Sequence, residues 1–177
     1  FYTMLNFSTI YNIPEKIKNT VPEAKFLYLI RNPFSRIISH YLHNRAIYKF
    51  NVSPDEFVHM DKYVIENTKY FTQISKYLQY FKKEQFKIKV IENFKPAPGV
   101  FMNDIFSFLE LKRLNSFPEF KMYNKTDIRK NIPQEELKFS ESTFQKLSDI
   151  FEKEIRELQK HFHLNLSAWD LTKETWC

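Results

Sequence analysis

Polar side chains that can bind an anion follow a short apolar run near the start of the chain. Arg31 ends the run, and Arg36, Ser39, His40 and His43 come within the next twelve residues. A guanidinium group can bind a phosphate through two parallel hydrogen bonds, a geometry that the ammonium group of lysine lacks. The residue types therefore indicate an anion site.

The surrounding residues predict a strand followed directly by a helix. Residues 25–30 (KFLYLI) have the length and composition of a buried strand. Pro33 suits the first turn of a helix, and apolar residues then recur at helical spacing as far as Leu42. Such a strand end lies at the carboxyl edge of a sheet, where open α/β sheets bind ligands and where a helix N-terminus attracts anions.

The run from residue 29 to residue 41, LIRNPFSRIISHY, resembles the 3′-phosphate-binding motif of the sulfotransferase family. In that motif a strand leads into Arg-Asp/Asn-Pro, a second Arg and Ser-x-Tyr. These enzymes bind 3′-phosphoadenosine 5′-phosphosulfate (PAPS) as co-substrate and transfer its sulfuryl group. The resemblance implies that Arg31 and Ser39 hold the 3′-phosphate. Arg36 belongs to the motif too, but an ion-pair role is equally open.

The resemblance implies an α/β fold with a P-loop-NTPase-like parallel sheet flanked by helices and a helix-rich C-terminal part. We expect residues 1–177 to form a single domain. The only glycine is Gly99, whereas a phosphate-cradling loop needs glycines. We therefore expect the chain to match the C-terminal two-thirds of a sulfotransferase domain, without the N-terminal strand, the 5′-phosphosulfate loop and the catalytic base.

A second basic segment lies between residues 115 and 138. Its basic cluster consists of Lys121, Lys125, Arg129 and Lys130. In the resembled family a basic loop at this place folds over the nucleotide and grips the 3′-phosphate. The resemblance therefore implies that Lys130 and Arg129 bind PAPS. The alternative is that they are solvated residues of a loop.

Other matches to the family concern packing. Residues 86–91 alternate as a strand with one buried face, which Glu92 closes. Helices are predicted over 100–111 and from a capping box at Ser142 to Phe162, and Trp169 is expected to cap the core. Lys69 and Phe71 stand where the family has Gly and Tyr, so no ligand contact is assigned there.

Composition limits the partners and the compartment. The formal charge of +6 favours anionic partners, and the single cysteine, Cys177, allows no internal disulfide framework. We expect no metal site, no membrane span and a cytoplasmic location, with a Golgi-lumenal domain left open. The aromatic residues fall on helical core stripes and do not alternate with basic ones, which argues against nucleic-acid binding.

The leading hypothesis is a PAPS-dependent sulfotransferase domain that acts on a hydroxyl or amine of a carbohydrate or small-molecule acceptor. The alternative is a non-catalytic remnant of the same fold that binds nucleotides or polyanions. The catalytic residues are not assigned: His40 and His43 lie on the predicted nucleotide-binding helix, which makes either a poor candidate for the base.

Overall fold

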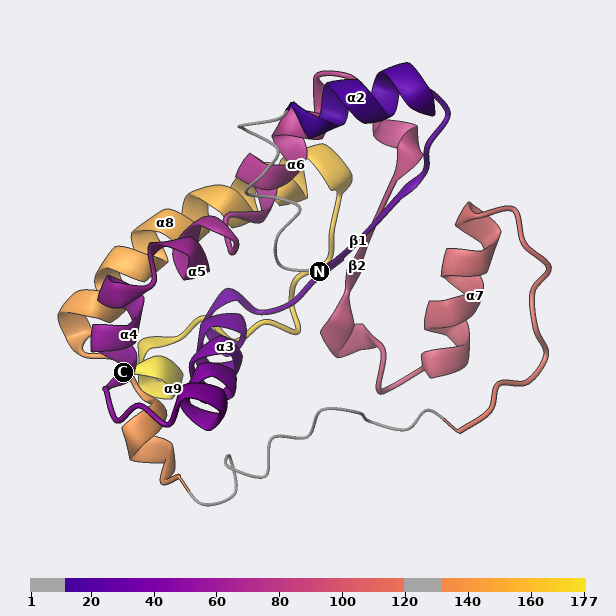
Figure 1. The fold of residues 1–177 in the computed structure, drawn as a ribbon. Coiled ribbons are helices and arrows are strands. Elements are labelled where there is room, and N and C mark those ends of the chain that lie inside the picture. Colours follow the sequence, from indigo (N-terminus) through magenta and orange to yellow (C-terminus); the bar gives the residue numbers. More distant parts are fainter. Residues whose placement is uncertain (1–11, 120–131) are drawn as a thin grey trace.

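A two-stranded parallel sheet lies at the centre of the computed structural model, which describes residues 12–119 and 132–177. Strands β1 (Phe26–Ile30) and β2 (Phe86–Val90) pair with Phe26 opposite Phe86 and Ile30 opposite Val90 (Figure 1). Both predicted strands are confirmed, and the parallel pairing brings their carboxyl ends to one edge. The α/β class is also confirmed.

Helices make up most of the rest of the described chain. The α-helices are α2 (Ile13–Thr20), α3 (Pro33–Tyr48), α4 (Pro54–Met60), α5 (Lys62–Glu66), α6 (Tyr70–Leu78), α7 (Pro98–Phe108), α8 (Glu141–Phe162) and α9 (Lys173–Trp176). Short 3₁₀ turns are η1 (Lys83–Gln85), η2 (Ile91–Asn93) and η4 (Gln134–Leu137). Figure 1 shows α6 and α8 on one side of the strands and α7 on the other.

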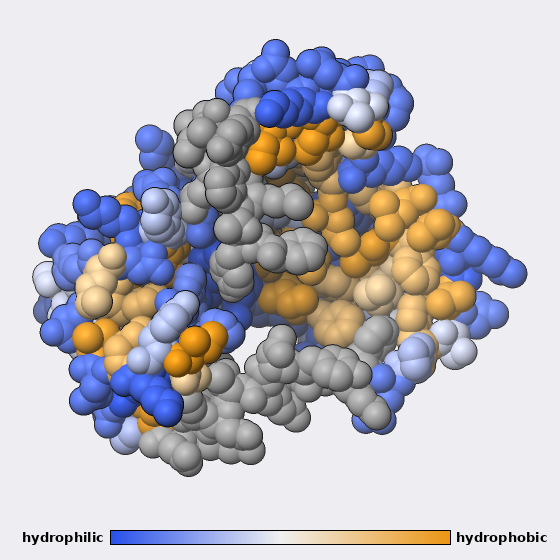
Figure 2. All heavy atoms as spheres, viewed as in Figure 1, coloured by the Kyte–Doolittle hydropathy of each residue, from blue (hydrophilic) through white to orange (hydrophobic). Residues whose placement is uncertain are grey.

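The two faces of the sheet differ in burial. On the side of α6 and α8, alternate residues of β2 are buried, namely Phe86, Ile88 and Val90. On the other side, Lys87 and Lys89 of β2 bond to α7, but Leu27 and Leu29 of β1 stay 40% and 50% exposed. The strand over residues 25–30 was expected to be buried. For the face with Leu27 and Leu29 this expectation is wrong, because α7 lies against β2 and leaves β1 uncovered. Figure 2 shows apolar side chains gathered around the strands and α7.

Two clusters of buried residues form the core. One lies around Phe34, Tyr41 and Phe151, between α3, α4 and α8. The other lies between the sheet, α6 and the C-terminal half of α8, and contains Tyr70 and Trp169. Ile155 and Leu171 pack against both clusters. The predicted helix that ends at Phe162 is confirmed as α8, which buries Phe144, Leu147, Phe151 and Leu158, and Trp169 is buried as expected.

Two helix boundaries differ from the sequence prediction. The N-cap of helix α8 lies two residues before the predicted one at Ser142, because Ser140 is the N-cap and its Oγ accepts from the backbone N–H of Thr143. Asp55 accepts from the N–H of Ser140 and thereby supports this earlier start. Helix α7 spans Pro98–Phe108 instead of 100–111, since Pro98 occupies the first turn and Glu110 has a positive φ of 59°.

Candidate nucleotide-binding site

The turn from β1 into α3 has the predicted form. Arg31 follows the last residue of β1, Asn32 is the N-cap of α3 and Pro33 is its first residue. Oδ1 of Asn32 accepts from the backbone N–H of Ser35 at 3.0 Å, which satisfies one of the free donors of the first turn. The 16-residue helix therefore starts beside the carboxyl edge of the sheet, the position at which α/β sheets bind anions.

The side chain of Arg31 is half-buried, and its carbonyl oxygen accepts from the hydroxyl of Tyr70 at 2.9 Å. Burial raises the pKa of Tyr70 above its ordinary value, and the nearby guanidinium groups of Arg36 and Arg31 offset only part of that rise. Both arginines are thus close enough to the same hydroxyl to act on it electrostatically. Two guanidinium groups near this edge of the sheet can attract an anion, and the carboxylate of Glu92 lies beside them.

Arg36 also forms contacts within the fold. Its Nη1 donates to Oγ1 of Thr68 at 2.7 Å and to the carbonyl oxygen of Val64 at 3.4 Å. Thr68 is completely buried and follows α5. These hydrogen bonds link α3 to the end of α5, so Arg36 has a structural role through a hydroxyl and a carbonyl.

Ser39 lies in the second turn of α3 and is half-buried. It belongs to the side of the helix opposite the buried residues Phe34, Ile37 and Tyr41, so it does not take part in the core stripe. Its role toward a phosphate stays a prediction. The other predicted ligands of the phosphate, Arg129 and Lys130, lie outside the described residues.

His40 contacts α4 and Asp61, the residue that follows this helix. Its ring packs against Phe57, with ring centres 5.6 Å apart, and its Nε2 lies 3.7 Å from Oδ2 of Asp61. Burial lowers the pKa of His40; Arg36 and His43 also lower it, whereas Asp61 raises it. These contacts are those of a packing residue. His43 is exposed.

Sequence analysis missed the role of Glu92, which it treated as the end of a strand. Oε1 of Glu92 accepts from the backbone N–H of Asn32 at 2.8 Å, and Oε2 accepts from Nε1 of Trp169 at 3.1 Å. One signal could have revealed this: carboxyl ends of parallel strands meet at one edge, so an acid that ends the second strand belongs beside the Arg that ends the first. The contact of Tyr70 with this turn had no distinguishing signal in the sequence.

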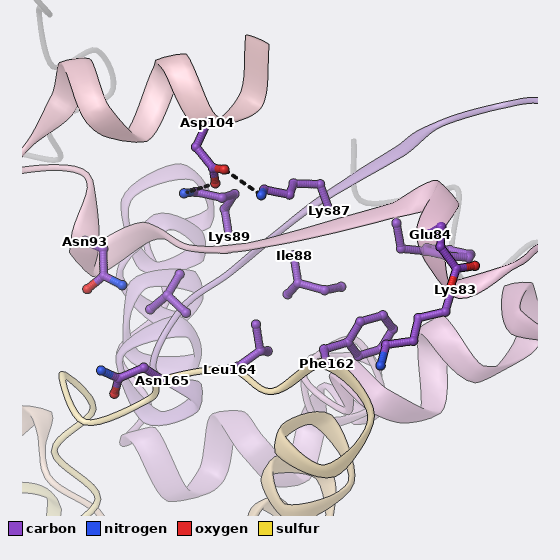
Figure 3. A pocket seen from close by; sticks show the side chains of 12 residues that line it. Lys83, Glu84, Lys87, Ile88, Lys89, Asn93, Asp104, Phe162, Leu164 and Asn165 are labelled. Atoms are coloured by element: carbon purple, nitrogen blue, oxygen red, sulfur yellow. Dashed lines mark hydrogen bonds and ion pairs between the residues drawn. The ribbon is translucent and has the colours of Figure 1, made fainter. Parts of the chain in front are cut away.

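A cavity of about 440 Å³ lies along β2 and is lined by residues of β2, α7 and the segment after α8. Figure 3 shows Lys87 and Lys89 pointing toward Asp104 of α7, whose carboxylate accepts from both ammonium groups at 2.6 Å and 2.7 Å. Burial acts to raise the pKa of Asp104, but these two bonds outweigh it and hold that pKa below its ordinary value. Neither Arg31 nor Ser39 lines this cavity.

The fold is that of an α/β protein with the turn at the carboxyl edge of its sheet, and the comparisons with known proteins agree with that class. The model of the sulfotransferase domain family matches residues 6–170, so the chain belongs to this family. The predicted family of enzymes is thereby confirmed. No curated protein matches the sequence significantly.

A solved structure supports the fold. The crystal structure of a sulfotransferase from Alicyclobacillus acidocaldarius is similar with a TM-score of 0.69 and 23% sequence identity. The similarity covers 92% of this chain and 64% of the other, so this chain spans less than two-thirds of the length of that protein. The predicted sulfotransferase-like fold is confirmed.

No set of three or more His, Cys, Asp or Glu side chains in 12–119 and 132–177 is placed to hold a metal ion. Within the same ranges, every helix is too short or too polar to cross a lipid bilayer.

Proposed function

We propose that the protein transfers a sulfuryl group from PAPS to a hydroxyl or amine of a carbohydrate or small-molecule acceptor. Arg31 and Ser39 bind the 3′-phosphate in this proposal, and Arg129 and Lys130 cover the nucleotide. The observation that carries it is the turn in which Arg31 leads from a parallel strand into the N-terminus of α3, in a chain of the sulfotransferase domain family.

The residues of the turn suit the 3′-phosphate of PAPS. A guanidinium group and a hydroxyl both donate hydrogen bonds to phosphate oxygens, and a second guanidinium, that of Arg36, adds positive charge nearby. PAPS supplies the sulfuryl group and the bisphosphate leaving group. The contribution of this chain is to hold that leaving group in place, since such transfers depend on positioning and charge stabilisation.

A thermal-shift titration with adenosine 3′,5′-bisphosphate tests the proposal. A ligand that binds only the folded protein raises its melting temperature, so we expect the wild type to be stabilised. Arg31→Ala should abolish the stabilisation and Ser39→Ala should reduce it. Arg113→Ala, at an exposed arginine after α7, is the matched control and should behave as the wild type. No stabilisation of the wild type at millimolar ligand would contradict the proposal.

The second candidate is a non-catalytic domain of the same fold that binds nucleotides or polyanions. It is supported by the formal charge of +6, which favours anionic partners in general and does not require sulfuryl transfer. Bisphosphate binding without transfer of labelled sulfuryl groups to any of a panel of acceptors would support it. Transfer that Arg31→Ala abolishes would support the enzyme.

The remaining proposals concern organisation and location. We propose that residues 1–177 belong to one domain, supported by the packing of Ile155 and Leu171 against both core clusters. A cytoplasmic location is proposed from the single cysteine, Cys177. The acceptor is proposed only as a class.

A further inference from the structure

Glu92 joins the ends of the two strands at the candidate site. Ile30 and Val90 are partners in the parallel ladder, and two residues beyond them the carboxylate of Glu92 accepts from the backbone N–H of Asn32 at 2.8 Å. Its second oxygen accepts from the indole Nε1 of Trp169 at 3.1 Å. Glu92 therefore connects β2, the turn before α3 and the segment after α8.

We infer that Glu92 is a positioning residue of the 3′-phosphate site, and that Trp169 orients it. It fixes the backbone between Arg31 and Pro33 and thereby sets the direction in which the Arg31 side chain leaves the sheet. The identity of the ligand in this inference rests on the proposed function. The hydrogen bonds of Glu92 are independent of that function.

The turn is fixed at every polar group of Asn32. Besides the bond to Glu92, its Nδ2 donates to the carbonyl oxygen of Asp170 at 2.6 Å. Its Oδ1 accepts from Ser35 N–H, and its carbonyl oxygen accepts from Arg36 N–H at 2.9 Å. Asn32 is only 4% exposed, so none of these bonds is easily replaced by water.

The partners of this turn come from distant parts of the sequence. Glu92 follows β2, Trp169 and Asp170 follow α8, and Tyr70 of α6 donates to the carbonyl oxygen of Arg31 at 2.9 Å. A catalytic or binding side chain acts precisely only when the residues behind it are held in turn. Of these contacts, that of Glu92 is the one made by a charged acceptor, and hydrogen bonds to charged groups are the stronger ones.

A carboxylate next to an anion site repels the ligand. Hydrogen bonds that its oxygens accept reduce this repulsion. Here each oxygen of Glu92 accepts from an N–H donor. Glutamine has the same shape but offers one acceptor and one donor, so Glu92→Gln turns an N–H toward either Asn32 or Trp169. One buried donor then faces another. The conservative substitution is thus expected to disturb the turn without leaving a cavity.

The test compares two nucleotides on the full chain by calorimetric titration. We expect Glu92→Gln to bind adenosine 3′,5′-bisphosphate about tenfold more weakly than the wild type does, the effect of losing one hydrogen bond to a charged group. Its affinity for adenosine 5′-monophosphate, which lacks the 3′-phosphate, should be unchanged. A general loss of stability would weaken the binding of both nucleotides alike. A loss of affinity for the bisphosphate alone therefore separates positioning from a merely structural role.

A double-mutant cycle tests the link to Trp169. Trp169→Phe removes the indole N–H, which leaves room for the amide NH₂ of glutamine to point there. Glu92→Gln should therefore cost less affinity for the bisphosphate in the Trp169→Phe background than in the wild type. Strictly additive effects would overturn the part of the inference that concerns Trp169.

Asp55→Asn is the matched control. The carboxylate of Asp55 accepts from the backbone N–H of Ser140, the N-cap of α8, at 3.0 Å, as Glu92 does from the N-cap of α3. This variant loses a comparable bond at a different helix and should bind the bisphosphate as the wild type does. Equal weakening by Asp55→Asn and Glu92→Gln would overturn the inference.

Hydrogen exchange of the backbone amides gives a readout that needs no ligand. Glu92→Gln should speed the exchange of the Asn32 and Ser35 amides, while Asp55→Asn should not. If the wild type binds neither nucleotide, the proposed function fails, and faster exchange at Asn32 still supports Glu92 as the residue that holds the turn. Unchanged exchange at Asn32 overturns the inference whatever the ligand does.

Discussion

The guanidinium of Arg36 donates a hydrogen bond to the hydroxyl of Thr68, 2.7 Å from Nη1, and that hydroxyl donates in turn to the carbonyl oxygen of Val64 at 2.6 Å. These hydrogen bonds hold α3 against the end of α5. In the proposed site Arg31 therefore binds the ligand, whereas Arg36 supports the fold.

Thr68→Val should destabilise the protein by about 2 kcal/mol, because valine keeps the shape of threonine but removes the acceptor of a buried charged donor. The free energy of unfolding in urea measures this. Thr20→Val is the control: Thr20 is exposed at the end of α2, where a substitution should change stability by no more than about 0.5 kcal/mol. Equal effects of the two substitutions would contradict the role assigned to Thr68.

The stability of the protein should depend on pH through His40. Burial lowers the pKa of this histidine below 6.5 in the folded state, so the unfolded chain takes up the proton more readily. The stability that neutral His40 contributes is present above the unfolded pKa and is lost as the pH falls below about 6.5. His40→Gln should therefore flatten the fall in unfolding free energy between about pH 7 and pH 5. The same slope in both proteins would refute this.

Glu154 of α8 supplies the cap that α6 lacks in its own sequence. The N-cap residue of α6, Lys69, makes no side-chain cap bond, but the carboxylate of Glu154 accepts from the backbone N–H of Thr72 at 2.8 Å and also from its hydroxyl. Glu154 is 9% exposed. The pair therefore replaces a local cap by one across two packed helices.

Glu154→Ala should lower the free energy of unfolding by about 2 kcal/mol, since it leaves the N–H and hydroxyl of Thr72 without their acceptor. Chemical denaturation followed by circular dichroism measures the change. Glu152→Ala, at an exposed position of the same helix, should alter stability by about 0.5 kcal/mol at most. A similar result for both glutamates would show that the bonds to Thr72 contribute little.

Much of the framework of the site could be predicted from the sequence because its signals are local. Pro33 and the spacing from Phe34 to Leu42 specify α3, and the apolar runs specify both strands. Arg31 could be placed at the sheet edge on the same grounds. These features depend on neighbours within a few residues.

Most contacts that fix the turn join residues that are distant in the sequence and were not predicted, although the end of β2 offered a signal for Glu92. Asn32 and Glu92 are separated by 60 residues, and Asn32 and Asp170 by 138. From the sequence alone, Glu154 is expected on the polar side of an amphipathic helix. Its contact with Thr72 depends on the packing of α6 against α8. Exposure of Leu27 and Leu29 likewise depends on where α7 lies, and not on the composition of β1.

The proposed role of Arg31 depends on the shape of its side chain as well as on its charge. Arg31→Lys keeps the positive charge but replaces a planar fork by a point charge, so the two parallel hydrogen bonds to a phosphate cannot form. We expect about tenfold weaker binding of adenosine 3′,5′-bisphosphate, the loss of roughly one charged hydrogen bond, measured by calorimetric titration. Added salt should weaken binding of the bisphosphate by the wild type and by this variant to the same extent, because arginine and lysine carry the same charge. Arg113→Lys, at the exposed arginine after α7, is the control and should bind as the wild type does. An Arg31→Lys variant with wild-type affinity would mean that the site attracts the phosphate by charge alone, and the bidentate role of Arg31 would have to be abandoned.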